Sequence, residues 1–300
     1  MAREIVECVP NFSEGRRKEV VDAISEAIRS VPGTKLLDVE MDANHNRAVV
    51  TFIGDRKAVA EAAFRGAQAA VQRIDLNVHR GEHPRIGALD VCPFVPVAGV
   101  SMADCVALAT DVGQRIAREL KVPVYLYEEA ATRPERRALP DLRKGEFEGL
   151  REEIKTNPER APDFGPRELH PTAGATVVGA RYPLIAFNVN LGTQDVDIAK
   201  KIAAAVRESS GGLKFVRAKG FALKDRGIVQ VSMNMLNYKG TPLFRAYELI
   251  KSEAERYGVH IVGSEIVGLV PLEAVADTAD FYLKLERFDV TQILETRLWE

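Results

Sequence analysis

Apolar and polar residues recur along the first part of the chain with two periods, one typical of strands and one typical of helices. Alternation predicts strands over residues 4–9, 35–40, 47–53 and 123–127. Apolar side chains spaced three and four apart predict helices over residues 16–30, 56–74 and 102–120. Asp55 precedes the second helix, and Ser101 with Asp104 opens the third, which are typical N-terminal capping residues.

The same order of elements returns in the last third of the chain. Strands are predicted over residues 184–190, 214–219, 229–235 and 259–262. Helices are predicted over 194–208, with Thr193 as its cap, and over 241–258 and 271–279. In the strand 229–235, Val229, Val231, Met233 and Met235 point to one face, and polar side chains point to the other. Each half therefore has the order strand–helix–strand–strand–helix–strand.

Residues 129–180 differ from both halves. Seven of the fifteen prolines fall between Pro134 and Pro183, and charged residues are dense. We expect an extended connection with one short helix near 144–155. The pattern predicts an α/β (α+β) protein with two ferredoxin-like βαββαβ subdomains and mainly antiparallel sheets. We place the N-terminal subdomain at residues 1–180, including the connection, and the C-terminal subdomain at 181–300, with a ligand cleft or tunnel between them.

Composition narrows the function classes. The chain of 300 residues has 41 Lys and Arg against 43 Asp and Glu, which gives a net charge of −2 and argues against a nucleic-acid binder. No run of about 18 apolar residues predicts a membrane span, and the N-terminus lacks the apolar region of a secretory signal. Three cysteines without CxxC spacing are typical of a reduced cytoplasm.

The densest chemistry lies at residues 79–94, which read HRGEHPRIGALDVCPF. His79 and His83 have the i, i+4 spacing of a zinc pair on a helix. However, Gly81 weakens a helix and Pro84 forces His83 into extended backbone, so we predict no metal site. Two interpretations remain open, a polar surface loop and a general acid–base at His83.

Two further polar segments have alternative interpretations. Glu40 ends a strand beside the turn 42–47, which either orients a substrate or is simply a hydrogen-bonded turn. Residues 163–174 are bracketed by Gly and Pro and either wrap a planar ligand or form a rigid linker. No GxGxxG, GxxxxGK[ST] or GxSxG pattern is present, and Cys92 has the setting of a buried hydrophobic residue rather than a nucleophile.

Five segments in order resemble the glutamate formimidoyltransferase family. They are VECVPNFSEGR at 6–16, GEHPRIGALDVCPFVPV at 81–97, VPVYLYEEAA at 122–131, APDFGP at 161–166 and VGLVPLEA at 267–274. The resemblance spans essentially the whole chain, which leaves no room for the cyclodeaminase domain of the fused mammalian members. It implies transfer of a formimino group from N-formimino-L-glutamate to N5 of tetrahydrofolate, the co-substrate, in histidine degradation.

The resemblance also implies site residues. The family's catalytic histidine corresponds to His83, and Glu40 stands where animal members have an aspartate. The family's folate-binding stretch corresponds to Gly165, Pro166, Arg167, Glu168, Leu169, His170, Pro171, Thr172, Ala173 and Gly174, whose middle differs from that of animal members. We further expect Glu40, Arg47 and Asp90 to orient substrate. Because folate and glutamate are anionic, Arg47, Arg85 and Arg181 are candidates to hold their carboxylates.

These implications complete the predictions. We expect a cytoplasmic homodimer acting on small molecules, with no metal and no nucleic-acid or membrane partner. Two alternatives remain open at this point. One is a related one-carbon activity on 5-formyltetrahydrofolate with glutamate as acceptor, and the other is a non-catalytic folate-binding module.

Overall fold

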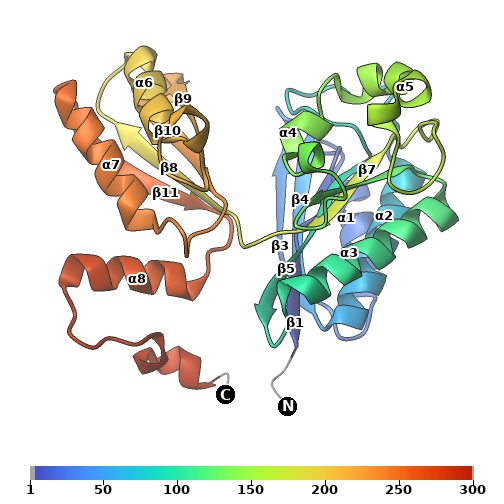
Figure 1. Cartoon of the computed structure of the whole chain (residues 1–300), viewed down its shortest axis with the longest axis horizontal. Coiled ribbons are helices and arrows are strands. Elements are labelled where there is room, and N and C mark those ends of the chain that lie inside the picture. The colour runs from blue at the N-terminus through green and yellow to red at the C-terminus, as the bar shows by residue number, and fades with distance from the viewer. Residues whose placement is uncertain (1–3, 299–300) are drawn as a thin grey trace. The chain divides into compact units, whose positions relative to one another are not determined.

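The computed structural model describes residues 4–298 (Figure 1). By its internal contacts the chain divides into two compact units, of which the first ends at Arg181 and the second begins at Tyr182. Each unit has its own sheet and its own hydrophobic core. Within the described residues, no helix is long and apolar enough to cross a membrane.

The first two strands of the chain lie inside the sheet of the first unit. They are β1 (Ile5–Cys8) and β2 (Asn11–Phe12), and both pair with β4 (Arg47–Gly54) on one side and with β5 (Leu89–Ala98) on the other. On the outer side of β4 lies β3 (Lys35–Asp42). All of these pairs are antiparallel, so β1 to β5 with the intervening helices form the predicted βαββαβ unit.

Two strands extend this sheet beyond the predicted motif. β6 (Val124–Glu128) and β7 (Thr176–Ala180) pair in parallel with each other, and β7 pairs in parallel with β5. The prediction of 123–127 as the closing strand of the first motif was wrong, because β5 closes it. The sequence did not predict β5 because it contains prolines at 93 and 96, which are rare inside a sheet. It did not predict β7 because this strand is fully buried within the proline-rich segment and shows no alternation of apolar and polar residues.

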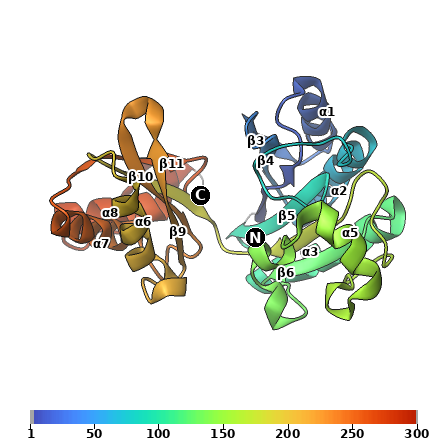
Figure 2. The ribbon, with the colours of Figure 1, turned by 90° about the horizontal axis from the view of Figure 1, so that it is seen from above.

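Three helices cover one face of the first sheet, α1 (Lys18–Arg29), α2 (Arg56–Arg73) and α3 (Met102–Arg115) (Figure 2). Asp55 caps α2 by accepting the Ala58 N–H at 2.8 Å, and Ser101 forms the predicted capping box with Asp104. Apolar side chains under these helices form the core, whereas Asn11 and Arg47 belong to the alternate positions that face away from the helices. The open face of the sheet is therefore available for polar groups.

The segment between β6 and β7 is an ordered part of the first unit rather than an extended connection. It contains α4 (Leu139–Leu142) and α5 (Glu146–Thr156). A buried ion pair joins Arg136 Nη1 to Asp163 Oδ2 at 2.6 Å and closes the ends of the segment on each other. Both partners are buried, so the loss of either one would leave an uncompensated charge inside the protein. The ion pair therefore stabilises the path of the segment.

The second unit is a complete βαββαβ motif. Its elements are β8 (Ile185–Leu191), α6 (Val196–Val206), β9 (Val216–Leu223), β10 (Ile228–Met235), α7 (Leu243–Arg256) and β11 (Ile261–Val267). The strand order is β11-β8-β10-β9, antiparallel throughout, as the ferredoxin-like prediction requires. Asp195, not the predicted Thr193, caps α6.

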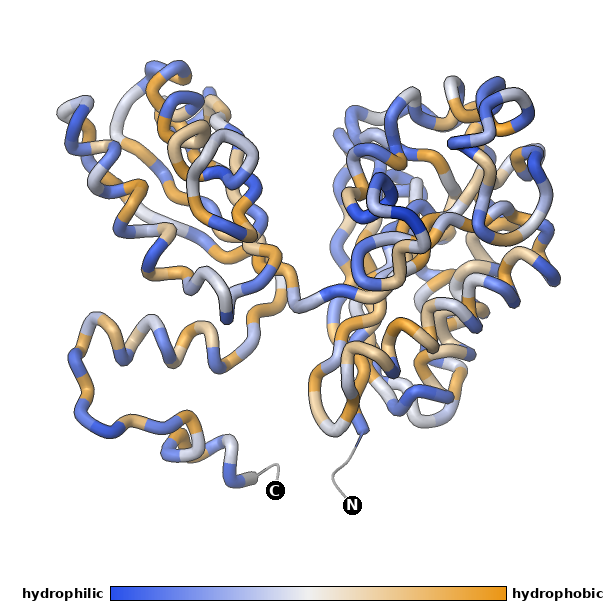
Figure 3. The backbone as a smooth tube through the Cα atoms, viewed as in Figure 1, coloured by the Kyte–Doolittle hydropathy of each residue, from blue (hydrophilic) through white to orange (hydrophobic). Residues whose placement is uncertain are grey.

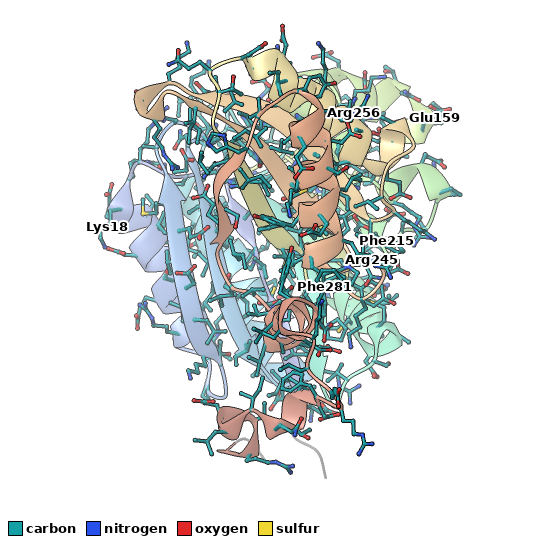
Figure 4. The ribbon with its side chains drawn as sticks, turned by 90° about the vertical axis from the view of Figure 1, so that its left-hand side faces the viewer. Lys18, Glu159, Phe215, Arg245, Arg256 and Phe281 are labelled. Atoms are coloured by element: carbon teal, nitrogen blue, oxygen red, sulfur yellow. The ribbon has the colours of Figure 1, made fainter. Side chains whose placement is uncertain are left out.

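A final helix, α8 (Leu272–Leu283), packs against α7. Phe281 stacks on Phe244 with ring centroids 4.2 Å apart, and its position is labelled in Figure 4. Figure 3 shows hydrophobic and hydrophilic segments alternating along α7 and α8. Behind α6 and α7, the predicted inward residues of β10, including Met233 and Met235, are fully buried. The polar residues of β10 consequently lie on the opposite face of this sheet.

Candidate active site

His83 lies in the loop that leads into β5. Its ring is half-buried, and the loop packs against the turn between β3 and β4. Glu82 N donates to the carbonyl of Asn44 at 3.2 Å, and a side chain at Gly81 would come within 2.2 Å of the His45 carbonyl. Only glycine permits this approach, so Gly81 allows the two loops to meet and brings His83 to the open face of the sheet.

The turn itself is fixed by Asp42. One carboxylate oxygen accepts the backbone N–H groups of Asn44 and His45, both at 2.9 Å, and the other lies 2.6 Å from His45 Nδ1. These hydrogen bonds lower the pKa of Asp42. They hold the His45 ring edge-on to the His83 ring, with centroids 6.2 Å apart. The turn between β3 and β4 is thus fixed by its own hydrogen bonds and supports the loop that carries His83.

Arg47 is the first residue of β4 and contacts His83 directly. Its Nη1 lies 3.2 Å from His83 Nε2 and donates to Asn11 Oδ1 at 3.2 Å. Its Nε is buried without a hydrogen-bond partner, and burial together with the nearby Arg143 lowers its pKa. Among the described residues no carboxylate lies within ion-pair distance of Arg47. The site therefore contains a cation with unused donor capacity.

The setting of His83 favours the neutral imidazole. Burial, the cations Arg47 and Arg143, and the His45 ring lower its pKa to about 3. Because a guanidinium only donates, His83 Nε2 accepts from Arg47, and the ring proton resides on Nδ1. At neutral pH, His83 is therefore an unprotonated base.

Asp90 holds Arg143 in this cluster. One oxygen of the buried Asp90 carboxylate accepts the Ile86 N–H at 2.7 Å, and the other pairs with Arg143 Nη2. Asp90 thus stands behind Arg143 rather than presenting a free carboxylate. Sequence reasoning missed Arg143, because it lies just after α4, in the segment interpreted as a connection. Its only signal was the density of charge there.

Glu40 lies near the same cluster but is exposed. It stands opposite Val49 in the register, two residues along β3 from Asp42, which stands opposite Arg47. Burial and Arg143 lower the pKa of Arg47, and the charge of Glu40, with those of Asp42 and Asp90, partly offsets this lowering. The structure thus brings His83, Arg47, Asp90 and Glu40 to one region of the first unit, and adds Arg143.

The other predicted histidine and arginine of the loop have structural contacts. His79 is buried, its Nε2 lies 2.9 Å from the Asn46 carbonyl, and its Nδ1 accepts from Arg85 Nε at 3.3 Å. Arg85 also binds Glu146 at 2.9 Å and Glu148 at 2.7 Å, which ties the loop to α5. Both nitrogens of His79 and the Arg85 guanidinium are thus occupied. Across residues 4–298, no group of three or more His, Cys, Asp or Glu gathers to hold a metal.

The first part of the predicted folate-binding stretch faces outward. Gly165, Pro166, Arg167 and Glu168 are exposed, and Glu168 pairs with Lys155 at 2.9 Å. Gly165 and Pro166, the first residues of the stretch, line a cavity of about 660 Å³. Its lining comprises Gln114, Ala117, Arg118, Lys121, Asp163, Phe164, Gly165 and Pro166. Its lining combines the cations Arg118 and Lys121 with the Asp163 carboxylate, and Arg118 pairs with Glu119 at 2.9 Å.

The second part of the stretch is anchored beside the histidine loop. Leu169 and Ala173 are buried, and His170 Nδ1 accepts the N–H groups of Thr172 at 3.3 Å and Ala173 at 3.0 Å. A side chain at Gly174 would meet the Ile86 carbonyl at 2.2 Å.

Two further contacts complete this anchor. The Ala88 N–H donates to the Ala173 carbonyl at 2.9 Å, and Asn77 Nδ2 donates to the Pro171 carbonyl at 3.0 Å. The backbone that follows His83 is therefore braced by residues 170–174.

Family models and known relatives match nearly the whole length of this chain. A family model described as the formiminotransferase domain, N-terminal subdomain, matches residues 5–181, and one described as the formiminotransferase domain matches residues 186–297. A glutamate formimidoyltransferase of Streptococcus pyogenes serotype M1 is 52% identical, covering 98% of this chain and 99% of the relative. One of Thermoplasma acidophilum is 54% identical, covering 98% and 97%. A formimidoyltransferase-cyclodeaminase of Rattus norvegicus is 50% identical over 96% of this chain and 54% of its own length.

Proposed function

Since this chain belongs to the formiminotransferase family and is an enzyme of the glutamate formimidoyltransferase type, we propose that it moves a formimino group from N-formimino-L-glutamate to N5 of tetrahydrofolate. The products are L-glutamate and 5-formiminotetrahydrofolate, as in histidine degradation. The observation that carries this proposal is the neutral His83 imidazole beside Arg47, a cation with unused donors.

The reaction needs one group that moves a proton. N5 of tetrahydrofolate attacks the formimino carbon and must lose its proton, and the departing glutamate nitrogen must gain one when its bond to that carbon breaks. His83 accepts the first proton through the imidazole and donates it to the leaving nitrogen. Since no bond to the enzyme forms, no nucleophilic side chain is required, and atoms balance with a single proton carrier.

Substrate binding adjusts the strength of this base. Arg47 and Arg143 both lower the pKa of His83. A substrate carboxylate on these guanidinium groups would compensate their charge and raise the His83 pKa part of the way toward its ordinary value of about 6.5, while the effect of burial remains. A histidine whose pKa lies closer to neutral pH both accepts and returns a proton more readily. We propose that Arg47 and Arg143 bind the glutamate carboxylates and so couple occupancy to base strength.

The remaining predicted residues receive supporting roles. Glu40, which is exposed near Arg47, would pair with the cationic formimino group, and Asp90 would keep Arg143 oriented. We assign the stretch Gly165–Gly174 to folate, with its exposed part in contact and its buried part as the brace of the His83 loop. A cytoplasmic homodimer remains our prediction for the assembly and its location.

The test is turnover by the purified chain. Incubation with N-formimino-L-glutamate and tetrahydrofolate should produce L-glutamate and 5-formiminotetrahydrofolate in equal amounts, followed by absorbance and chromatography. His83→Ala should lower kcat by about 10²- to 10⁴-fold, or about 3–5 kcal/mol of barrier, with an unchanged melting temperature. The exposed His260 provides the control, and His260→Ala should keep wild-type kcat. Full turnover by His83→Ala would exclude the acid–base role.

A further inference from the structure

A buried asparagine precedes Arg47 in the turn between β3 and β4. This residue, Asn46, has a left-handed backbone with φ at 49°, a conformation that asparagine adopts more readily than most other residues. The backbone of Asn46 sets the direction in which β4 begins. It therefore determines where the Arg47 side chain leaves the main chain.

The Asn46 side chain joins this turn to two other segments. Its Nδ2 donates to the Arg80 carbonyl at 2.9 Å, at the start of the loop that carries His83. Its Oδ1 accepts the Gly15 N–H at 2.9 Å, in the segment between β2 and α1. A side chain at Gly15 would come within 2.5 Å of Arg47 N, so that segment lies directly against the start of β4. Each polar atom of the amide thus binds a different segment.

The Asn46 carbonyl is held by His79. Because a guanidinium only donates, His79 Nδ1 accepts from Arg85 Nε, and the ring proton resides on Nε2. His79 Nε2 therefore donates to the Asn46 carbonyl at 2.9 Å. Burial lowers the pKa of His79, which favours this neutral form. The ion pairs of Arg85 with α5 hold the guanidinium that selects the tautomer.

The bonds of Asn46 are not needed to close the turn. Asp42 already closes it through the backbone N–H groups of Asn44 and His45. The side-chain amide and the carbonyl of Asn46 instead bind residues outside the turn, and two of these three bonds reach the start of the His83 loop. Among the described residues no carboxylate pairs with Arg47, so the position of its guanidinium depends mainly on where β4 begins. Asn46 thus bears on both ends of the Arg47–His83 contact.

We propose that Asn46, held by His79, is a positioning residue that keeps Arg47 and His83 in contact for the transfer step. This inference rests on the proposed function, in which Arg47 binds a substrate carboxylate and His83 moves the proton. Both groups must stay aligned while the formimino carbon passes between two nitrogens. A displacement of about 1 Å in such an arrangement can cost about 10²-fold in rate. Asn46 is buried and acts through these two residues.

Asn46→Gly tests this role, because glycine tolerates left-handed backbone and removes both side-chain hydrogen bonds. It should lower kcat by about 10- to 100-fold. It should also raise the pKa of the His83 ring, measured by NMR, by about 1, because an Arg47 guanidinium that retreats by about 2 Å repels the ring proton less.

Asn44→Gly is the matched control. Asn44 is exposed in the same turn, and among the described residues its side chain makes no hydrogen bond. This variant gains the same backbone freedom without losing a link between segments, so it should keep the wild-type kcat and the wild-type His83 pKa.

Two substitutions of His79 decide the question if Asn46→Gly does not fold. His79→Gln keeps an N–H donor for the Asn46 carbonyl, whereas His79→Leu removes it. The His83 pKa should stay at its wild-type value in His79→Gln and rise in His79→Leu. An equal His83 pKa in the two variants would overturn the inference.

The outcomes for folded Asn46→Gly are equally distinct. A wild-type kcat, or a reduced kcat with an unchanged His83 pKa, overturns the positioning role, because a residue that only stabilises the fold would not move that pKa. The titration needs no substrate and so separates this inference from the proposed function. Absence of transfer by the wild type, with the pKa difference present, would overturn the proposed function and leave the role of Asn46 in the contact supported.

Discussion

The contact between Arg47 and His83 makes a quantitative prediction. Arg47→Met removes the cation whose Nη1 lies 3.2 Å from His83 Nε2, while it keeps a side chain of similar length. Without the cation, the protonated imidazole is less disfavoured, so the pKa of His83 should rise from its value of about 3.

The size of the rise follows from Coulomb's law. Two unit charges about 4–5 Å apart interact by about 3–4 kcal/mol at an effective dielectric constant of about 20, which corresponds to about two to three in pKa as an upper limit. Burial is the largest cause of the lowered pKa and remains in the variant, as does Arg143. We therefore expect the His83 pKa to rise by about 1–2 and to stay below about 6.5.

The measurement is an NMR titration of the histidine rings. The chain has five histidines, so His83→Gln identifies the resonance that belongs to His83. Arg65→Met is the control, because Arg65 is an exposed residue of α2 that pairs with Glu61. It should leave the His83 titration where the wild type has it. A His83 pKa that is the same in Arg47→Met and in Arg65→Met would refute the electrostatic account.

Three further predictions concern charge, metal and pH. Tetrahydrofolate polyglutamates should lose more affinity than the monoglutamate when salt is raised, because each added carboxylate is a screened charge, and equal salt slopes would argue against recognition by arginines. Exhaustive chelation should leave the transfer rate unchanged, and a loss restored by zinc would establish a metal. The free energy of unfolding should fall as the pH drops from about 6.5 toward 3, since the unfolded chain binds a proton at His83 that the folded chain refuses. Thermal melts at pH 7 and pH 4.5 should therefore show a smaller difference for His83→Gln than for the wild type.

Periodicity was sufficient for the second unit and insufficient for the first. In β10 the alternation of Val229, Val231, Met233 and Met235 with polar residues marks a sheet with one buried face, and the structure has that strand at Ile228–Met235. In the first unit, β5 and β7 are buried by neighbours on both sides, so neither shows alternation. Pro93 and Pro96 further masked β5, because proline is rare inside a sheet.

The candidate site was accessible from sequence only in part. Residue type and the constraint of Pro84 singled out His83, but nothing in the sequence pairs it with Arg47, 36 positions earlier. That contact depends on Gly81, which lets the loop reach the turn at His45. Arg143 depends on Asp90, a partner 53 positions away. Tertiary contacts of this kind have no periodic signal, so only the structure reveals them.

Burial lowers the pKa of His83 most, and the arginines that would bind the substrate lower it further. An arginine pair that attracts carboxylates necessarily repels a proton from a histidine in contact with it. Before binding, His83 is therefore a weak base, because its protonated form is disfavoured. In the proposed mechanism, a carboxylate on Arg47 would compensate this repulsion, and the imidazole would become a stronger base when N5 must lose its proton. Binding energy at the charged end of the substrate would thus increase the proton affinity of His83 at the reacting end, and the base would be stronger in the loaded site than in the empty one.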